Sequence, residues 1–351
     1  MRRGFACGIV SVALTLLLLP SVATSSTLGD PQMSQQWGLH KIQAEEAWSI
    51  ADGSGAIIAI VDSGVDLTHP DLASKLLIYP DADIYEPQGS CSGGGGSKNC
   101  TQDGPQDLNG HGTHVAGIAG ALTDNGVGVA GTAPGARLLP VRVLDQNGDG
   151  RTRDVAAGIR YAADKGADVI NLSISFRGVQ GEQARLTGQL RPIYDALDYA
   201  AGKGVVSVVA AGNEGVPVCT EPAAAPRVLC IGASARSDLR TYYSNGDATQ
   251  LKNYLVAPGG DGLACDGEIV STYLRAAERT CGKEDGYDGL SGTSMSAPFV
   301  SGVAALLAGQ GLSGQEIISC ILRTTDDLGP RGRDAIFGYG RVNAFEAVSS
   351  C

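Results

Sequence analysis

Short apolar runs alternate with segments of helical pattern along most of the chain. The runs have the length of buried strands, and the segments between them place apolar residues at helical spacing. The expected strands are 56–61, 137–143, 168–173, 205–210, 228–231 and 254–257, and the expected helices are 111–122, 153–165, 192–203, 293–309, 313–324 and one after Asn343. This alternation predicts one continuous α/β domain, with a mostly parallel central sheet and helices on both of its faces.

One stretch, residues 79–109, interrupts the alternation. It is rich in Gly, Asp, Pro and Ser, and it contains Cys91 and Cys100. We expect a surface excursion restrained by a disulfide, rather than a linker between domains.

The N-terminus has the order of features of a secretory signal peptide. Arg2 and Arg3 precede an apolar run over 9–19, and small residues follow up to Ala23. The alternative, an uncleaved anchor helix, is less favoured because the run is shorter than the ~20 residues that span a bilayer. The sequence therefore predicts a signal peptide over 1–23, a short segment over 24–30 and one domain over 31–351, in a secreted, extracellular protein without membrane attachment after cleavage.

Export changes the meaning of the nine cysteines. Cys7 lies in the signal peptide, and an even number remaining in an exported chain favours disulfides, although many pairings are possible. Our prediction pairs each cysteine with its neighbour: 91 with 100, 219 with 230, 265 with 281, and 320 with 351. A metal role is the weaker alternative because the chain has no CxxC pair.

The chain carries 26 basic and 37 acidic side chains, which gives a net charge of −11. An acidic surface repels phosphate backbones and anionic headgroups, which argues against nucleic-acid and membrane-surface partners. The 43% hydrophobic share and the 50 glycines fit a globular protein with many tight turns, and we expect it to be a monomer.

The first candidate for chemistry is Asp62, at the end of the expected strand 56–61. Ligands of open α/β sheets bind beyond the carboxyl ends of strands, although a single Asp at such a place is usually a turn residue. Asp62-Ser63-Gly64 also matches the core of aspartic protease sites. That chemistry needs a second such carboxylate, and the sequence has no other Asp-Ser-Gly or Asp-Thr-Gly.

The chain has four histidines, His40, His69, His111 and His114. His111 begins an expected helix among glycines that let a substrate approach, which makes it the best general base. His111 and His114 have the spacing of a metal-binding pair, but the Glu and the third ligand of zinc enzymes are missing. We expect His114, one turn further on, to be a packed core residue.

Ser294 and Asn213 are the remaining candidates. Ser294 lies in the first turn of an expected helix, where unpaired N–H groups and the helix dipole favour developing negative charge. An ordinary N-cap serine is the alternative. Asn213 follows an expected strand and would usually be a turn residue, but beside a nucleophile its amide could donate to an oxyanion together with the N–H of Ser294.

Four segments resemble the signatures of the subtilisin-like serine proteases, the subtilase family, and they occur in the family's order. They are 61–64 (Val-Asp-Ser-Gly), 111–114 (His-Gly-Thr-His), 211–213 (Ala-Gly-Asn) and 292–298 (Gly-Thr-Ser-Met-Ser-Ala-Pro). The resemblance runs from about Pro31 to the C-terminus and is closest to the thermitase branch, which 41–44 and 141–145 also resemble. It implies a secreted serine endopeptidase that hydrolyses proteins or peptides.

The resemblance also implies a role for each motif residue. Ser294 would attack the peptide carbonyl, His111 would take and return the proton, and Asp62 would orient the imidazole and stabilise its charged form. Asn213 would complete the oxyanion hole. The alternative is a catalytically silent member of the fold that serves as a binding module. Loss of one of these residues would be its mark, and all four are present.

The family holds an extended peptide between two short edge strands. Gly148, Asp149 and Gly150 match one of them, Ser173, Ile174 and Ser175 match the other, and Gly212 adjoins the cleft. Relatives commonly have Gly-Gly where this chain has Ser175-Phe176, so we expect Phe176 to narrow or reshape the cleft. Asp149 and Glu214 would favour basic substrate side chains unless they are solvated surface carboxylates, which is the interpretation we prefer.

Calcium is the cofactor that the resemblance implies. Its strong site would take carboxylates from Asp30 and Asp71, the side-chain oxygen of Asn125, and the backbone carbonyls of Leu122, Val127 and Val129. A plain Asn-Gly turn at Asn125 is the alternative. Residues 145–150 imitate the start of an EF-hand, but Ala156 stands where the bidentate acid should be, so we reject that site. An additional site in 81–107 has no clear match.

Most exported relatives carry a domain-sized inhibitory propeptide before the catalytic region. Here only residues 24–29 separate the predicted signal peptide from the first matched segment. We therefore expect folding without such a propeptide in the same chain, supported by calcium, by disulfides or by a helper chain.

Overall fold

The computed structural model describes Met1 and residues 29–85, 104–176, 178–250, 253–275, 277–281 and 283–351. The predicted signal peptide beyond Met1, residues 24–28 and the predicted pair of Cys91 with Cys100 lie outside these residues.

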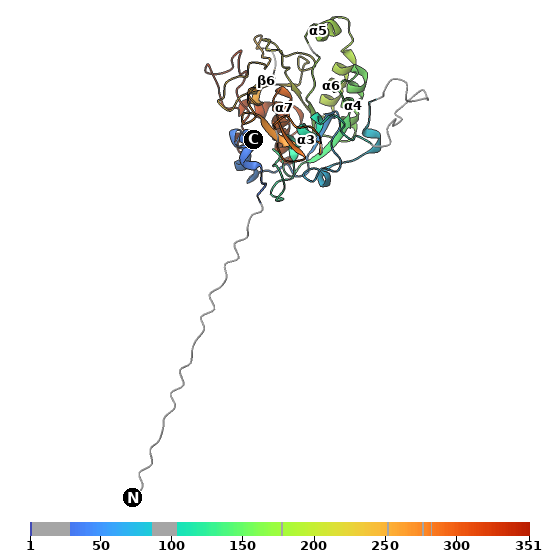
Figure 1. Ribbon diagram of the computed structural model, residues 1–351. Helices are drawn as coiled ribbons and strands as arrows, with labels where there is room; N and C mark the ends of the chain where they lie inside the picture. The colour runs from blue at the N-terminus through green and yellow to red at the C-terminus, as the bar shows by residue number, and fades with distance from the viewer. Residues whose placement is uncertain (2–28, 86–103, 177, 251–252, 276, 282) are drawn as a thin grey trace.

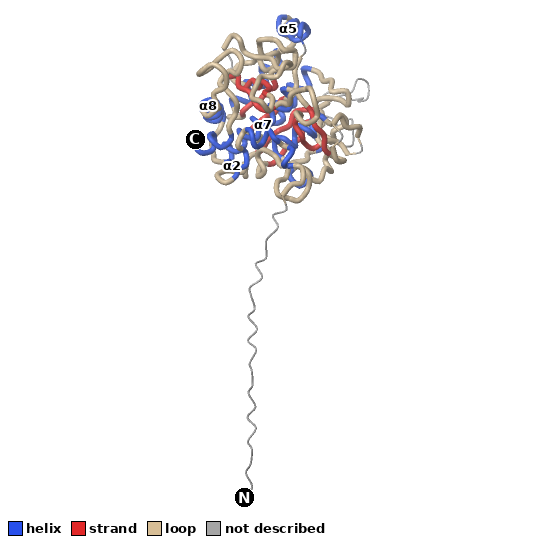
Figure 2. The backbone as a smooth tube through the Cα atoms, turned by 60° about the vertical axis from the view of Figure 1, so that its left-hand side comes forward, coloured by secondary structure: helices blue, strands red, loops and turns tan. Residues whose placement is uncertain are grey.

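A six-stranded parallel sheet with the order β2-β1-β3-β4-β5-β6 forms the interior of the fold (Figure 2). Its strands are β1 (Ile57–Asp62), β2 (Arg137–Arg142), β3 (Val169–Leu172), β4 (Val206–Ala210), β5 (Leu229–Ser234) and β6 (Asn253–Pro258). Apart from the first residues of β1, β2 and β6, every residue of these strands is buried. Burial on both faces explains the continuous apolar runs. All six predicted strands are confirmed, with ends that shift by a few residues.

Helices cover both faces of this sheet. They are α1 (Trp37–Lys41), α2 (Ala44–Trp48), α3 (His111–Gly120), α4 (Thr152–Asp164), α5 (Gly178–Leu186), α6 (Arg191–Gly202), α7 (Thr293–Gly309), α8 (Gly314–Arg323) and α9 (Ala344–Ser350). Short 3-10 helices span Met33–Gln35, Ala73–Lys75 and Pro80–Ala82. The predicted helices correspond to α3, α4, α6, α7, α8 and α9. The first ends at Gly120 rather than at residue 122, because the N–H of Leu122 donates to the Asp71 carbonyl at 2.9 Å.

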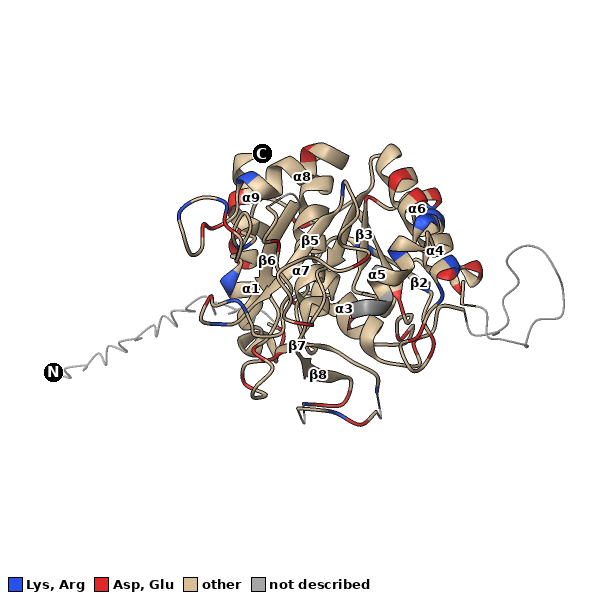
Figure 3. Cartoon of the chain, turned by 90° about the horizontal axis from the view of Figure 1, so that it is seen from above, with Lys and Arg blue, Asp and Glu red and all other residues tan. Residues whose placement is uncertain are grey.

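Alternate strand residues face two separate cores. In β1, Ile58 and Ile60 face the core that α3, α7, α8 and α9 line, whereas Ala59 and Val61 face the core that α4 and α6 line. Figure 1 shows α3 packed beside α7 and α4 packed beside α6. The two central helices of the first core, α3 and α7, carry no Lys, Arg, Asp or Glu, while α4 and α6 carry acidic and basic side chains (Figure 3). Helices on both faces of one parallel sheet confirm the predicted fold class.

Some elements have no counterpart in the prediction. They are α1, α2, α5 and an antiparallel hairpin of β7 (Ile269–Thr272) and β8 (Tyr287–Leu290). Among the described residues no single helix has the length and hydropathy of a membrane span, and α7 and α8 reach them only together, as a pair bent by 119°.

Covalent and backbone contacts hold the loops to this core. The disulfides Cys219–Cys230, Cys265–Cys281 and Cys320–Cys351 are formed, which confirms the three predicted pairs that the described residues contain.

The two ends of the 79–109 excursion are hydrogen-bonded to the backbone at the edge of the sheet. The N–H of Ile84 donates to the Arg142 carbonyl and that of Asp107 to the Val65 carbonyl, so the excursion leaves and re-enters beside the carboxyl ends of β2 and β1.

Candidate active site

Asp62 and His111 form a hydrogen-bonded pair at the carboxyl edge of the sheet. Asp62 is the last residue of β1 and is fully buried, and His111 is the first residue of α3. His111 Nδ1 lies 2.8 Å from Asp62 Oδ1, which also accepts the N–H of Ser63 at 2.7 Å. The aspartate is the hydrogen-bond acceptor here, so it fixes the tautomer that carries the proton on Nδ1 and leaves Nε2 basic.

The two neighbouring histidines have opposite pKa shifts. Burial lowers the pKa of His111, but the charge of Asp62 and its hydrogen bond outweigh burial and hold this pKa above the usual 6.5. His114 is fully buried, with Nε2 at 3.2 Å from the Asp288 carbonyl, and burial lowers its pKa to about 3. His114 is therefore neutral and packed, as predicted, and His111 is the histidine that can exchange protons near neutral pH.

Ser294, the second residue of α7, lies against the end of β3. Its hydroxyl donates to the Ser173 carbonyl at 3.2 Å, and the Ser173 hydroxyl donates to the Ser294 carbonyl at 2.8 Å. The second bond has a simple cause: Pro298, four residues on, has no N–H to donate to that carbonyl. Within the described residues no hydrogen bond joins Ser294 Oγ to His111 Nε2, because the hydroxyl points to Ser173 instead.

Asn213 follows β4 and is anchored to the residue before Ser294. Its Oδ1 accepts the N–H of Thr293 at 2.9 Å and the Thr293 hydroxyl at 3.0 Å, which leaves Nδ2 as the outward donor. A Cβ built on Gly292 would lie 3.5 Å from this Nδ2 and 3.7 Å from the backbone N of Ser294. Two donors thus flank the space that glycine leaves open at Gly292.

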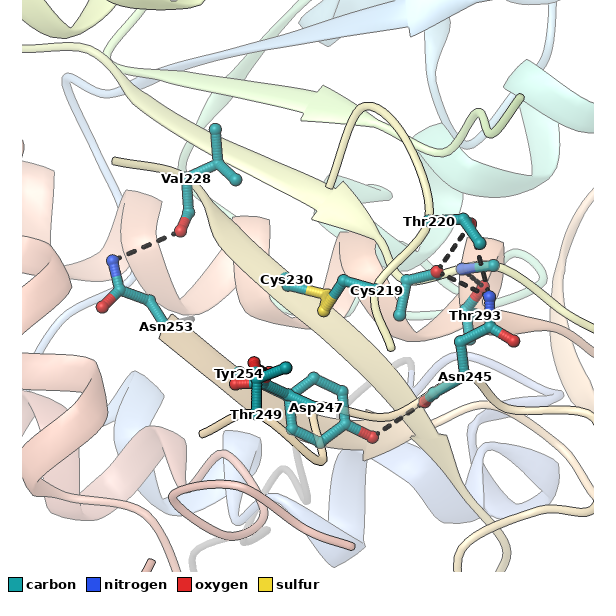
Figure 4. Close-up of a disulfide and its surroundings, with 12 residues drawn as sticks. Cys219, Thr220, Val228, Cys230, Asn245, Asp247, Thr249, Asn253, Tyr254 and Thr293 are labelled. Carbon is teal, nitrogen blue, oxygen red and sulfur yellow. Dashed lines mark hydrogen bonds between the residues drawn. A yellow bond between two sulfur atoms is a disulfide. The ribbon is translucent and has the colours of Figure 1, made fainter. Parts of the chain in front are cut away.

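Gly212 lies where no side chain fits. Its φ is +105°, its N–H donates to the Thr293 hydroxyl at 3.2 Å, and a Cβ would come within 2.3 Å of both Asn245 Nδ2 and Thr220 Oγ1. Figure 4 shows Asn245, Thr220 and Thr293 together beside the Cys219–Cys230 disulfide. Asn245 Nδ2 also donates to Glu214 at 2.7 Å, so the exposed Glu214 carboxylate is held at one oxygen.

The two predicted edge segments adjoin the candidate residues. The turn with Gly148, Asp149 and Gly150 closes on Asp145, and Asn109 Nδ2 ties it to the loop before His111 through the Gln146 carbonyl at 3.0 Å. Ile174 and Ser175, which follow Ser173, are partly exposed. Phe176 is half-buried and packs against the second core, and its N–H donates to the Glu221 carbonyl at 2.8 Å.

The six predicted calcium ligands come from three segments, and Asp30 and Asp71 both contact the loop after α3 that holds the other four. Asp30 Oδ1 accepts the N–H of Asn125 at 3.0 Å, and Asp71 Oδ1 accepts the Asn125 amide at 2.8 Å. Burial raises the pKa of both carboxyls, and Asp71 raises that of Asp30 further. Within the described residues, the carbonyl oxygens of Leu122, Val127 and Val129 accept no hydrogen bond.

These residues fit a hard cation. Two buried carboxylates that repel each other, together with free carbonyls, provide the oxygen ligands that calcium prefers. Within the described residues no three His, Cys, Asp or Glu side chains meet at a metal-binding distance, so such a site depends on amide and backbone oxygens. The Asn-Gly turn alternative also has support, since Asn125 Oδ1 accepts the N–H of Val127 at 2.7 Å.

Asn245 and Tyr287, which were not among the predicted residues, also contact these sites. Asn245 holds the loop behind Asn213, and the Tyr287 hydroxyl donates to Asp71 at 3.0 Å. Both reach their partners from distant segments of the chain, and no local pattern marks either one.

Comparison with known proteins identifies the family. The subtilase family (Peptidase_S8) matches residues 53–340. Thermitase from Thermoactinomyces vulgaris is 41% identical over 324 residues, which cover 92% of this chain and 99% of thermitase. The thermophilic serine proteinase of Bacillus sp. (strain AK1) is 40% identical over 90% of this chain and 67% of its own length.

A solved structure of a protease from Pseudoalteromonas arctica superposes with a TM-score of 0.77 at 31% identity and covers 93% of this chain and 99% of its own. The matches to thermitase and to the family confirm the resemblance seen in the four motifs. The chain is a serine endopeptidase and belongs to the subtilase family.

Proposed function

We propose that this endopeptidase works through a triad of Asp62, His111 and Ser294, with Asn213 and the N–H of Ser294 as the oxyanion hole. The observation that carries the proposal is the 2.8 Å hydrogen bond between Asp62 Oδ1 and His111 Nδ1. Ser294 and Asn213 meet the same edge of the sheet through Ser173 and Thr293.

The proposed reaction has two steps, acylation and then deacylation of Ser294. Ser294 Oγ turns from the Ser173 carbonyl to His111, and Nε2 takes its proton as the oxygen attacks the peptide carbonyl carbon. The negative oxygen is held by Asn213 Nδ2 and the Ser294 N–H. His111 then gives the proton to the leaving amine, the C–N bond breaks, and an acyl ester remains on Ser294. In the second step His111 takes a proton from water as the water oxygen attacks the ester carbonyl. It then gives this proton to Ser294 Oγ as the acid product leaves. Asp62 stabilises the charged imidazole in both steps.

The substrate is an extended protein or peptide segment. The segments Gly148–Gly150 and Ser173–Ser175 would pair with its backbone, which requires little sequence from the substrate. Gly212, which has no side chain, would leave room for the substrate backbone beside the oxyanion hole. Phe176 packs against the second core, so it would affect the cleft by fixing the position of the segment Ser173–Ser175 that precedes it.

Calcium would be held by Asp30, Asp71, Asn125 and the carbonyls of Leu122, Val127 and Val129. It would neutralise two carboxylates whose burial raises their pKa and join the N-terminal segment to the loop after α3.

We also propose that the protein is secreted by cleavage of a signal peptide over 1–23 and acts outside the cell as a monomeric domain over 31–351, after the short segment 24–30. The charged and apolar N-terminal residues and three disulfides support this location. The net charge of −11 argues against nucleic-acid and membrane partners.

Casein hydrolysis by the purified protein at neutral to mildly alkaline pH tests the proposal. We expect Ser294→Ala to abolish activity and Asn213→Ala to lower kcat by about 10²- to 10³-fold, the range known for one oxyanion donor in a related subtilisin. Asn253→Ala is the control, because its amide donates to the Val228 carbonyl away from the site. Activity that survives in folded Ser294→Ala would contradict the proposed nucleophile.

A further inference from the structure

A second buried carboxylate, Asp107, lies directly behind the Asp62–His111 pair. It is 2% exposed and belongs to the end of the 79–109 excursion, where its N–H donates to the Val65 carbonyl at 3.1 Å. Among the described residues no Lys or Arg forms an ion pair with it. The side chain therefore keeps its place through hydrogen bonds.

Both oxygens of Asp107 accept several donors. Oδ1 accepts the N–H of Asn109 at 2.9 Å, the N–H of Gly110 at 3.0 Å and the Ser63 hydroxyl at 2.9 Å. Oδ2 accepts the N–H of Thr113 at 2.9 Å and the Thr113 hydroxyl at 2.6 Å. These donors come from the segment on either side of His111 and from the residue next to Asp62.

The unpaired N–H groups at the start of α3 are satisfied by this arrangement. The N–H of Gly112 donates to the Ser63 hydroxyl at 3.0 Å, and the N–H of His111 donates to Asn109 Oδ1 at 3.1 Å. Asp107 thus holds the backbone before and after His111, directly or through one intermediate side chain.

The packing around the carboxylate leaves little room for movement. A Cβ on Gly64 would lie 2.6 Å from the Pro105 carbonyl oxygen, and one on Gly112 would lie 2.1 Å from the Gly64 carbonyl oxygen. The loop after β1, the end of the excursion and the first turn of α3 are therefore in backbone contact. A shift of Asp107 would be transmitted to both partners of the pair.

We propose that Asp107 is a positioning residue for the endopeptidase reaction: it fixes Asp62 and His111 relative to each other through Ser63, Gly110 and Thr113. The inference rests on the proposed triad. Asp107 touches neither the substrate nor the reacting atoms. Its charge also favours the protonated imidazole of His111, together with Asp62, while the neighbouring His114 is neutral.

Asp107→Asn tests this role. The side-chain carbonyl of the asparagine can accept the donors that Oδ1 accepts in the wild type. Its NH₂ group, in the place of Oδ2, cannot accept the N–H of Thr113, so the first turn of α3 loses a hydrogen bond. We expect kcat on a chromogenic peptide substrate, per folded molecule, to fall by up to about 100-fold with KM nearly unchanged. The acid limb of kcat/KM should move to lower pH, because a negative charge near His111 is lost.

A merely structural role would lower the thermal midpoint but leave the acid limb in place. Asp334→Asn is the matched control, since Asp334 is also buried and accepts the N–H groups of Ile336 and Phe337 at 2.6 and 2.9 Å. We expect it to keep the wild-type kcat and acid limb. An Asp107→Asn protein that is folded and has both wild-type values would overturn the proposal.

Thr113→Val covers the case in which Asp107→Asn does not fold. It removes the hydroxyl donor to Asp107, together with the acceptor of the Asp66 N–H at 2.9 Å, and keeps the charge of Asp107. We therefore expect kcat to fall by a smaller factor while the acid limb stays. Wild-type kcat in this variant would then overturn the proposal. Ser294→Ala distinguishes failure of the proposed triad from failure of the role of Asp107. Activity in folded Ser294→Ala would contradict the triad itself. If Ser294→Ala is inactive, the Asp107 and Thr113 variants test the positioning role separately.

Discussion

At the scale of single residues, chemistry depends on which groups keep or lose a proton. Asp62 holds the pKa of His111 above 6.5, whereas burial lowers the pKa of His114 to about 3 and makes it a core residue. Two histidines three positions apart therefore have different uses. The difference comes from a neighbour at the end of β1, which the spacing of the two histidines does not reveal.

The pH dependence of activity follows from this pair. His111 must be neutral to accept the Ser294 proton, so kcat/KM should fall as the pH drops through a pKa above 6.5. Asp62→Asn should move this limb to lower pH, because the charge that favours the imidazolium is gone. It should also lower kcat by about 10⁴-fold, as the same exchange does in another triad protease.

Rate measurements between mildly acidic and alkaline pH with a fluorogenic peptide would show both effects. Asp164→Asn, at an exposed carboxylate that contacts Lys203, should leave the limb unchanged. The same limb in wild type and Asp62→Asn would mean that another group controls activity.

At the scale of elements, the loop after β4 depends on a glycine. Gly212→Ala would place a Cβ within 2.3 Å of two side chains at a φ of +105°, so we expect a loss of about 2 kcal/mol in unfolding free energy. Denaturant unfolding in a Ser294→Ala background, which prevents self-digestion, measures this.

Gly202→Ala is the matched control, because nothing lies within 4 Å of its added Cβ at the end of α6. Its stability should stay the same or rise by up to about 1 kcal/mol. Equal stability of the two variants would show that the loop relaxes around the new methyl group.

Periodicity and motifs predicted much of the fold because long, buried elements leave a strong pattern. All of β1 except its first residue is buried, and α7 is apolar on every side, so their sequences are distinctive. Helices α1 and α2 have five residues each, too few to show a period. Gly178 and Gly181 weaken the pattern of α5. The contacts of Asn245 and Asp107 were not predicted because they join segments that meet only in the folded chain.

At the scale of the whole molecule, the proposed calcium site joins the N-terminal segment to the domain. Saturating calcium at about 100 times its Kd would contribute about 2.7 kcal/mol. We therefore expect chelation to lower the thermal midpoint of Ser294→Ala by several degrees. Asp71→Asn in the same background should abolish the difference between calcium and chelator.

Asp145→Asn, in the rejected EF-hand-like segment, should respond to calcium like its parent. Calorimetry with and without chelator decides between the outcomes. No calcium effect in the parent, or an equal effect in Asp71→Asn, would support the plain turn at Asn125.

The helix that carries Ser294 is also the central helix of the larger core. α7 packs against α3 and against strands β3 to β6, and nearly all of its side chains are buried. Any opening that loosens this helix therefore displaces the nucleophile. A partly unfolded molecule is therefore inactive itself and can only be cleaved as a substrate by an intact molecule. Self-digestion should then be an intermolecular reaction whose rate falls steeply on dilution.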